Sequence, residues 1–313
     1  MDVITDPASA EPPPGGTVVT IGAYDGVHLG HQAVIVEVRR LAAELGCRSA
    51  VVTFDRHPAT VVRPESAPKL LTDLDQKLEL LAEHGVDITV VVPFDEARSK
   101  EEPEEFIREV LVDALAARAV VVGQDFHFGH QRRGNVGLLS EIGRREGFVV
   151  RGVPLLERPD GIEEPVSSTA IRRALAGGDV EPVAAMLGRP YEVRGIVVRG
   201  DQRGRTIGFP TANVEVPNST ALPADGVYAG TYVRPDGTEH PCAINLGRRP
   251  TFYEHADHSL LEAHLLDFSG ELYGEPARVR FKHFLRSERK FSGIDELVAQ
   301  LRHDVEHART MLA

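Results

Sequence analysis

The sequence has little cysteine and no long apolar run. Cys47 and Cys242 are its two cysteines among 313 residues, and they lie far apart without a CxxC pair. This excludes a disulfide framework and favours a reducing, cytoplasmic location. No apolar stretch approaches the ~20 residues of a membrane helix, and residues 1–16 lack the basic and apolar segments of a signal peptide. We therefore expect neither secretion nor a membrane partner.

Positive charge is also scarce. Lysine and arginine number 35 against 47 aspartates and glutamates, so the formal net charge is −12. This argues against a nucleic-acid partner held by a broad positive field. Any anionic ligand must therefore be held by local basic residues and backbone amides. Nothing in the composition indicates or excludes a homo-oligomer.

The chain is long enough for two domains, and its pattern changes near Leu187. Residues 1–16 are acidic and proline-rich, which predicts a disordered tail. Across residues 17–187, short apolar runs alternate with helical patterns. This predicts an α/β domain whose parallel sheet is covered by helices on both faces. The expected strands are residues 18–22, 49–54, 88–94, 119–123 and 148–153.

Residues 188–313 follow a different pattern. Residues 277–281 alternate polar and apolar side chains, and Asp236 and Gly237 separate two extended segments as in a hairpin turn. This half is expected to form an antiparallel sheet or a small barrel. It ends in one amphipathic helix, because the apolar residues at 294, 297, 301, 305, 308 and 312 form a single stripe.

The stretch GAYDGVHLGH, residues 22–31, is the first candidate site. A strand, a glycine-containing turn and a helix start follow one another, which presents backbone N–H groups and a helix N-terminus to a phosphate. His28 and His31 can share one face of the first helical turn and donate hydrogen bonds to a nucleotide. A plain turn with two surface histidines is one alternative. A metal site is another, although an HExxH glutamate and a third ligand are missing.

The stretch GDQRGRTIGFPTAN, residues 200–213, is the second candidate site. Thr211 and Asn213 are two residues apart, so they share a face if this piece is extended. A hydroxyl and an amide oxygen suit Mg²⁺, which prefers hard oxygen ligands. The alternative is an irregular glycine-rich turn without a ligand.

Glu262 is a candidate general base. In SLLEAHLLDF it shares a strand face with His264, opposite the apolar Leu261, Ala263 and Leu265. A carboxylate in this position can take a proton from a hydroxyl group. The alternative is a solvent-facing polar pair on an edge strand, and His264 is expected to be structural.

Several of these stretches resemble one family. GAYDGVHLGH resembles the HxGH-type signature of adenylyl- and cytidylyltransferases, in the form typical of prokaryotic bifunctional riboflavin kinase/FAD synthetases, with Tyr24 replacing the usual phenylalanine. GRTIGFPTAN resembles the riboflavin kinase signature of the same family. Further segments match it in order: TFDRHP (53–58), VGQDFHFGHQRRGN (122–135), SSTAIRRAL (167–175), DGVYAG (225–230), NLGRRPTF (245–252) and LLEAHLLDFSGELYG (260–274).

The resemblance covers nearly all of residues 17–312. It implies a Rossmann-like nucleotidyltransferase domain, which transfers the adenylyl group of ATP to FMN and yields FAD. It also implies a β-barrel riboflavin kinase domain, which makes FMN from riboflavin and ATP. Both reactions would use Mg²⁺.

The resemblance assigns residues to the first domain as follows. His28, His31 and Arg172 would stabilise phosphate charge; Gly22, Asp25, Gly30, Ser168 and Thr169 would contact ATP; Asp125, Phe126 and Phe128 would line the flavin. Read alone, Ser168 and Thr169 fit an N-cap cluster better than a binding site, with Arg172 as a solvated charge. The two phenylalanines are equally core aromatics.

In the second domain the resemblance makes Glu262 the catalytic base and Thr211 and Asn213 the magnesium ligands. Gly204, Arg205 and Gly208 would hold ATP. Three rival functions predict different products. A kinase whose first domain is only a scaffold forms FMN without FAD, a flavin sensor turns over no ATP, and a cytidylyltransferase fused to a barrel uses CTP.

Overall fold

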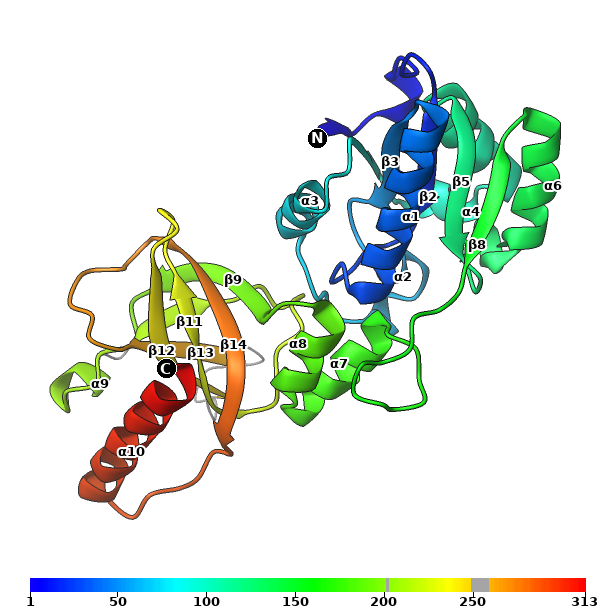
Figure 1. Ribbon diagram of the computed structural model, residues 1–313. Helices are drawn as coiled ribbons and strands as arrows, with labels where there is room; N and C mark the ends of the chain where they lie inside the picture. The colour runs from blue at the N-terminus through cyan, green and yellow to red at the C-terminus, as the bar shows by residue number, and fades with distance from the viewer. Residues whose placement is uncertain (201–202, 249–258) are drawn as a thin grey trace. The chain divides into compact units, whose positions relative to one another are not determined.

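The computed structural model describes residues 1–200, 203–248 and 259–313, which form two compact units, Met1–Ser168 and Thr169–Ala313 (Figure 1). The first unit is built on a six-stranded sheet with the strand order β1-β4-β3-β2-β5-β8. Every pairing in this sheet is parallel. The strands are β1 Asp2–Ile4, β2 Thr17–Ile21, β3 Arg48–Phe54, β4 Ile88–Val92, β5 Ala117–Gly123 and β8 Val149–Val153. The predicted α/β domain is confirmed.

Helices connect these strands. The longer ones are α1 Leu29–Leu45, α3 Leu74–Glu83 and α6 Val136–Glu146, and α5 Pro103–Phe106 continues into a π-helix at Ile107–Asp113. The shorter elements are α2 Ala59–Val62, α4 Glu96–Lys100, β6 His127–Phe128 and β7 Gly134–Asn135. Gly46 ends α1 in the left-handed conformation, with φ of 63°, as its place after the apolar stripe predicts.

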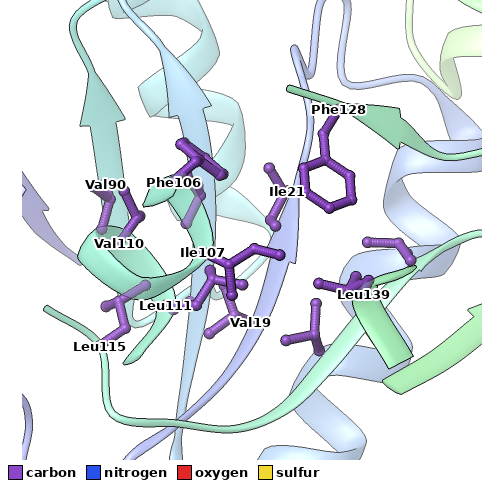
Figure 2. Packing of buried hydrophobic residues seen from close by; sticks show 14 of the residues in the cluster. Val19, Ile21, Val90, Phe106, Ile107, Val110, Leu111, Leu115, Phe128 and Leu139 are labelled. Carbon is purple, nitrogen blue, oxygen red and sulfur yellow. The ribbon is translucent and has the colours of Figure 1, made fainter. Parts of the chain in front are cut away.

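Both faces of the sheet are covered because side chains along each strand alternate between them. Val19 and Ile21 of β2 pack with Ile107 and Leu111 in one core cluster (Figure 2). Val18, one position away, packs instead with residues of α1. The central strands β2, β3, β4 and β5 are therefore buried on both sides, which explains their continuous apolar sequences.

The N-terminal segment corrects one prediction. Residues 2–4 are not disordered but form the edge strand β1, which pairs with β4, and Asp2 forms an ion pair with Arg48 at 2.6 Å. The acidic and proline-rich composition of residues 1–16 predicted disorder. The three residues of β1 are too few to show the alternation of a strand in the sequence. Their order comes from the open edge of β4, which is a tertiary feature.

The second unit is a closed antiparallel barrel with the strand order β10-β13-β12-β11-β14-β9. The strands are β9 Tyr191–Val198, β10 Ala212–Glu215, β11 Gly226–Val233, β12 Glu239–Arg248, β13 Ser259–Leu265 and β14 Pro276–Arg286. The helices are α7 Ser168–Gly177, α8 Val180–Leu187, α9 Arg203–Thr206 and α10 Ile294–Leu312. The terminal helix α10 packs beside the barrel, as expected (Figure 1). The Asp-Gly hairpin is also confirmed, since Val233 pairs with Glu239 and Gly237 has φ of 83°.

The division between the units falls earlier than the predicted boundary near Leu187. Helix α8 packs against β9 and β14, and it buries Val183, Met186 and Leu187. The backbone N–H of Ala224 donates to the carbonyl of Leu175 in α7, at 2.9 Å. Both helices continue the α/β sequence pattern, yet α8 packs on strands of the barrel.

Leu111 tests the importance of the large core cluster. The change Leu111→Ala removes a fully buried side chain and should lower the free energy of unfolding by about 3 kcal/mol. Denaturant titration followed by circular dichroism measures this. Val149→Ala, at a side chain that is 62% exposed, is the matched control, and equal losses for both variants would contradict the described packing.

Candidate functional site

GAYDGVHLGH forms the turn between β2 and α1, which we call the histidine loop, residues 22–31. Tyr24, Gly26 and Val27 have φ of 50°, 84° and 38°, and the two residues other than glycine are strained in this region. The Tyr24 hydroxyl donates to the hydroxyl of Thr20 at 2.8 Å. The N–H of Gly26 donates to the hydroxyl of Thr72 at 3.0 Å.

The two histidines of the loop stack on each other. Their ring centroids are 3.6 Å apart and their planes differ by 18°. His28 is the N-cap of α1, and its Nδ1 accepts a long hydrogen bond of 3.4 Å from the N–H of His31. Since Nδ1 accepts this bond, Nε2 is the ring nitrogen that can donate to a ligand. Gly30 makes room for this arrangement, because a Cβ there would lie 3.2 Å from the His28 ring.

The surroundings of His31 favour its neutral form. Burial, together with the charges of His28 and Lys77, keeps the pKa of His31 well below its usual value. Its Nδ1 is buried and has no hydrogen-bond partner among the described residues. A buried nitrogen of this kind is well suited to meet a polar ligand atom. In the described part of the chain, no three His, Cys, Asp or Glu side chains gather as metal ligands would, so the zinc alternative gains no support.

Asp25 fastens the loop to the segment before α3. Its carboxylate accepts hydrogen bonds from the N–H of Leu71 at 2.9 Å and from the N–H of Thr72 at 3.0 Å. The Thr72 hydroxyl lies 3.3 Å from the same oxygen. Asp25 is only 3% exposed. The arrangement gives Asp25 a structural task that the sequence pattern did not reveal.

The SST motif reaches the same loop. The hydroxyl of Ser168 donates to the backbone carbonyl of Asp25 at 2.8 Å. This bond joins two motifs that lie 143 residues apart in the sequence. Thr169 and Arg172 follow on α7 in the second unit, and their part in nucleotide binding stays a prediction.

The predicted flavin-lining residues follow β5. Asp125 is exposed, Phe126 is partly buried and Phe128 is 8% exposed within the core cluster. The two rings lie 5.3 Å apart and differ by 15° in plane (Phe128 in Figure 2). The burial of Phe128 agrees with the core alternative, and a flavin contact by these residues stays a prediction.

Lys77 is a buried group that the sequence reasoning missed. It lies on α3 three and four residues before the buried Leu80 and Leu81, so it occupies a position on the apolar face of that helix. Burial lowers its pKa to about 8, although Asp25 and Asp55 oppose this shift. The available signal was a charged residue at an apolar position of a helical pattern.

In the barrel, strand register gathers the predicted kinase residues. Glu262 on β13 pairs with Asn213 on β10 and with Asn245 on β12. Asn245 Nδ2 donates to Glu262 Oε2 at 3.5 Å. Neighbouring residues on adjacent strands share a face, so one carboxylate and two amides meet there. Sequence reasoning gave Asn245 no role, because pairing between distant strands is not visible in a local pattern.

Two cavities meet at these residues. The glutamate cavity, about 410 Å³, is lined by Thr211, Asn213, Asn245, Glu262 and His264, and by Leu297 and Leu301 of α10. The loop cavity, about 310 Å³, is lined by Arg205, Thr211, Asn213, Phe268 and Tyr273 among others. Gly204, Thr211 and Asn213 border both. The edge-strand alternative for Glu262 is excluded, since β13 lies between β10 and β12.

Glycines allow the close packing around Asn213. A Cβ at Gly200 would lie 2.6 Å from the Asn213 amide, and one at Gly204 would lie 2.3 Å from the carbonyl oxygen of Phe209. Gly208 has φ of 88° and makes the following turn. His264 Nδ1 lies 2.7 Å from the carbonyl oxygen of Pro210, which agrees with a structural role. Residues 201–202 and 249–252 of the sequence motifs lie outside the described residues.

Comparisons with known proteins agree with both halves. A model of the FAD synthetase family matches residues 10–170, and a model of the riboflavin kinase family matches residues 187–312. The two matches define the class, a flavin-nucleotide transferase with two domains.

Named relatives give the particular family. A bifunctional riboflavin kinase/FMN adenylyltransferase of Listeria monocytogenes is 40% identical over 95% of this chain and 92% of its own. The protein of the same name from Escherichia coli K12 is 37% identical over 96% of this chain and 94% of its own. The chain belongs to the family of bifunctional riboflavin kinase/FMN adenylyltransferases. This supports the two-activity prediction over a kinase with a scaffold domain.

A solved structure shares the fold. A crystal structure described as a macrolide-efflux protein from Streptococcus pneumoniae has a TM-score of 0.85 and 29% identity, and the match covers 98% of each chain. Among the helices of the described residues, none combines the length and apolar character needed to cross a bilayer.

Asp25→Ala tests the structural task of this carboxylate. The change leaves the N–H groups of Leu71 and Thr72 without their acceptor and should lower the free energy of unfolding by about 3 kcal/mol. Denaturant titration of the full chain checks this. Asp75→Ala, at an exposed position on the neighbouring α3, should change stability little. A stable Asp25→Ala variant with lost FAD synthesis would instead indicate direct nucleotide contact.

Proposed function

We propose that the two reactions of this family are divided between the glutamate cavity and the histidine loop. The barrel phosphorylates riboflavin to FMN, and the α/β unit adenylylates FMN to FAD. The observation that carries the first assignment is the register of β10, β12 and β13, which brings Glu262 beside Asn213 and Asn245 in one cavity. A cytoplasmic location, suggested by the two unpaired cysteines, belongs to the same proposal.

In the kinase reaction Glu262 acts as general base. Its carboxylate takes the proton of the 5′-hydroxyl of riboflavin while that oxygen attacks the γ-phosphorus of ATP. The Asn245 amide orients the carboxylate. The apolar side chains of α10 that line the glutamate cavity, Leu297 and Leu301, suit a flavin ring. The loop cavity offers Arg205 to phosphate oxygens and aromatic rings to adenine.

Thr211 and Asn213 fit the predicted Mg²⁺. Both supply neutral oxygen ligands, and both border the two cavities, where the phosphate chain of ATP would pass between nucleotide and flavin. Mg²⁺ would supply charge neutralisation there. Asn213 is 6% exposed, and the absence of a side chain at Gly200 leaves space for its amide. The surrounding protein therefore holds the Asn213 side chain in position.

In the adenylyl transfer the protein supplies no nucleophile. An oxygen of the FMN phosphate attacks the α-phosphorus of ATP, and pyrophosphate leaves. His28 Nε2–H donates a hydrogen bond to phosphate oxygen, with the first N–H groups of α1 beside it. His31 contributes as a neutral donor, because its pKa is too low for it to carry charge. Arg172 joins this proposal through the SSTAIRRAL match alone.

A time course of products tests the whole proposal. The purified chain is incubated with riboflavin, ATP and Mg²⁺, and the flavins are separated by chromatography. FMN that rises first and FAD that follows are expected. FMN without FAD would support the scaffold alternative, and bound flavin without turnover would support the sensor.

Glu262→Gln should abolish FMN formation while FAD formation from added FMN continues. The amide cannot accept the hydroxyl proton, so kcat should fall about a hundredfold or more. Glu306→Gln, at an exposed position of α10, is the control and should retain both activities. Equal loss of both reactions in Glu262→Gln would contradict separate sites.

The double variant His28→Ala with His31→Ala should show the reverse behaviour. FMN formation should persist, while FAD formation should fall about a hundredfold because the phosphate donors are lost. The double variant His303→Ala with His307→Ala, at exposed positions of α10, is the matched control. Unchanged FAD synthesis without His28 and His31 would refute a phosphate-binding role for the histidine loop.

A further inference from the structure

Lys77 is buried and forms no direct ion pair with another described residue. Its side chain is 7% exposed, and its Nζ donates to the hydroxyl of Thr53 and to the carbonyl of Phe54, each at 3.2 Å. Both acceptors are neutral, and no carboxylate in the described part of the chain forms an ion pair with Lys77. Burial of an unpaired ammonium group is costly. A methionine or leucine would cover the same helix face without that cost.

The bonds of Lys77 lead to the histidine loop. The Thr53 hydroxyl donates its single proton to the carbonyl of Ala23, at 3.1 Å, so it can only accept from Lys77. The chain of contacts therefore runs from α3, through the end of β3, to the start of the loop. A second link joins the same regions, because Leu71 and Thr72, just before α3, bind the carboxylate of Asp25.

The loop depends on such external support. Tyr24 and Val27 have positive φ, a conformation that persists only where surrounding contacts enforce it. His28 directly follows Val27, so a change in the backbone of residues 24–27 would move both histidine rings. The link through Ala23 precedes the strained residues, and the link through Asp25 lies between them.

The charges around Lys77 match this location. Asp25 in the loop and Asp55 after β3 attract the ammonium group, and the charge of Lys77 helps to lower the pKa of His31 on α1. The pKa of Lys77, about 8, leaves the group charged at pH 7, whereas His31 is neutral. Lys77 thus supplies positive charge behind a loop that is proposed to bind polyphosphate, in a chain of net charge −12.

We propose that Lys77 is a positioning residue for adenylyl transfer, whose buried side chain fastens α3 to the end of β3 and, through Thr53, supports the histidine loop. The inference rests on the proposed function of that loop. Lys77 acts through Thr53 and Ala23, and its buried charge lowers the stability of the unit that contains it.

The variant Lys77→Met in the full chain separates function from stability. The kcat for FAD formation from FMN should fall about tenfold or more, with smaller changes in KM, because misplaced groups lose transition-state contacts. The melting temperature of the first unit should stay equal or rise, since methionine carries no charge to desolvate. This gain should be largest below pH 8 and should shrink toward pH 10.5, because the folded pKa of Lys77, about 8, lies below the ordinary value of 10.5.

A residue with only a structural role would lose stability and activity together. That outcome, or an unchanged kcat in Lys77→Met, would overturn the proposal. Lys77→Gln keeps a hydrogen-bond donor without charge and should retain more activity than Lys77→Met; the opposite order would also overturn it. Glu83→Gln, at an exposed position of α3, is the control for loss of one charge on this helix.

The variant without His28 and His31 separates this inference from the proposed function. If that double variant keeps FAD synthesis, the function proposed for the histidine loop fails whatever Lys77 does. If it loses FAD synthesis while Lys77→Met keeps its kcat, the loop assignment stands and the inference about Lys77 fails.

Discussion

The carboxylate of Asp25 is the interaction on which the α/β site depends. It accepts the N–H groups of Leu71 and Thr72 and so fixes a loop whose backbone conformation is unfavourable by itself. Ser168 adds a bond to the carbonyl of the same residue. The loop is thereby joined to two distant parts of the sequence. This network holds the backbone that carries both histidines.

The barrel solves the same problem by a different means. Its site residues lie on strands, and the register of antiparallel pairing sets them side by side without a strained turn. A shift of one residue in β13 would replace Glu262 by an apolar neighbour in the cavity. The buried row of Leu261, Ala263 and Leu265 prevents that shift, because it would expose the row and bury the carboxylate.

Much of this molecule was readable from local patterns. Continuous apolar strands predicted the parallel sheet, and the alternation around Glu262 predicted a polar strand face. Some features were not readable. Strand β1 depends on the open edge of β4, and helix α8 depends on the barrel that covers it. Lys77 left one local signal, a charged residue at an apolar position of a helical pattern.

The sequence by itself determined the two-domain order, the periods of the elements and the residue types able to bind phosphate, magnesium and a hydroxyl proton. These are local properties, since period and side-chain chemistry need no distant partner. Only the tertiary structure decided three contacts. Asp25 accepts backbone N–H groups, Asn245 donates to Glu262, and the buried Lys77 donates to Thr53. Each of these depends on contacts between residues at least 17 positions apart in the sequence, which only folding brings together.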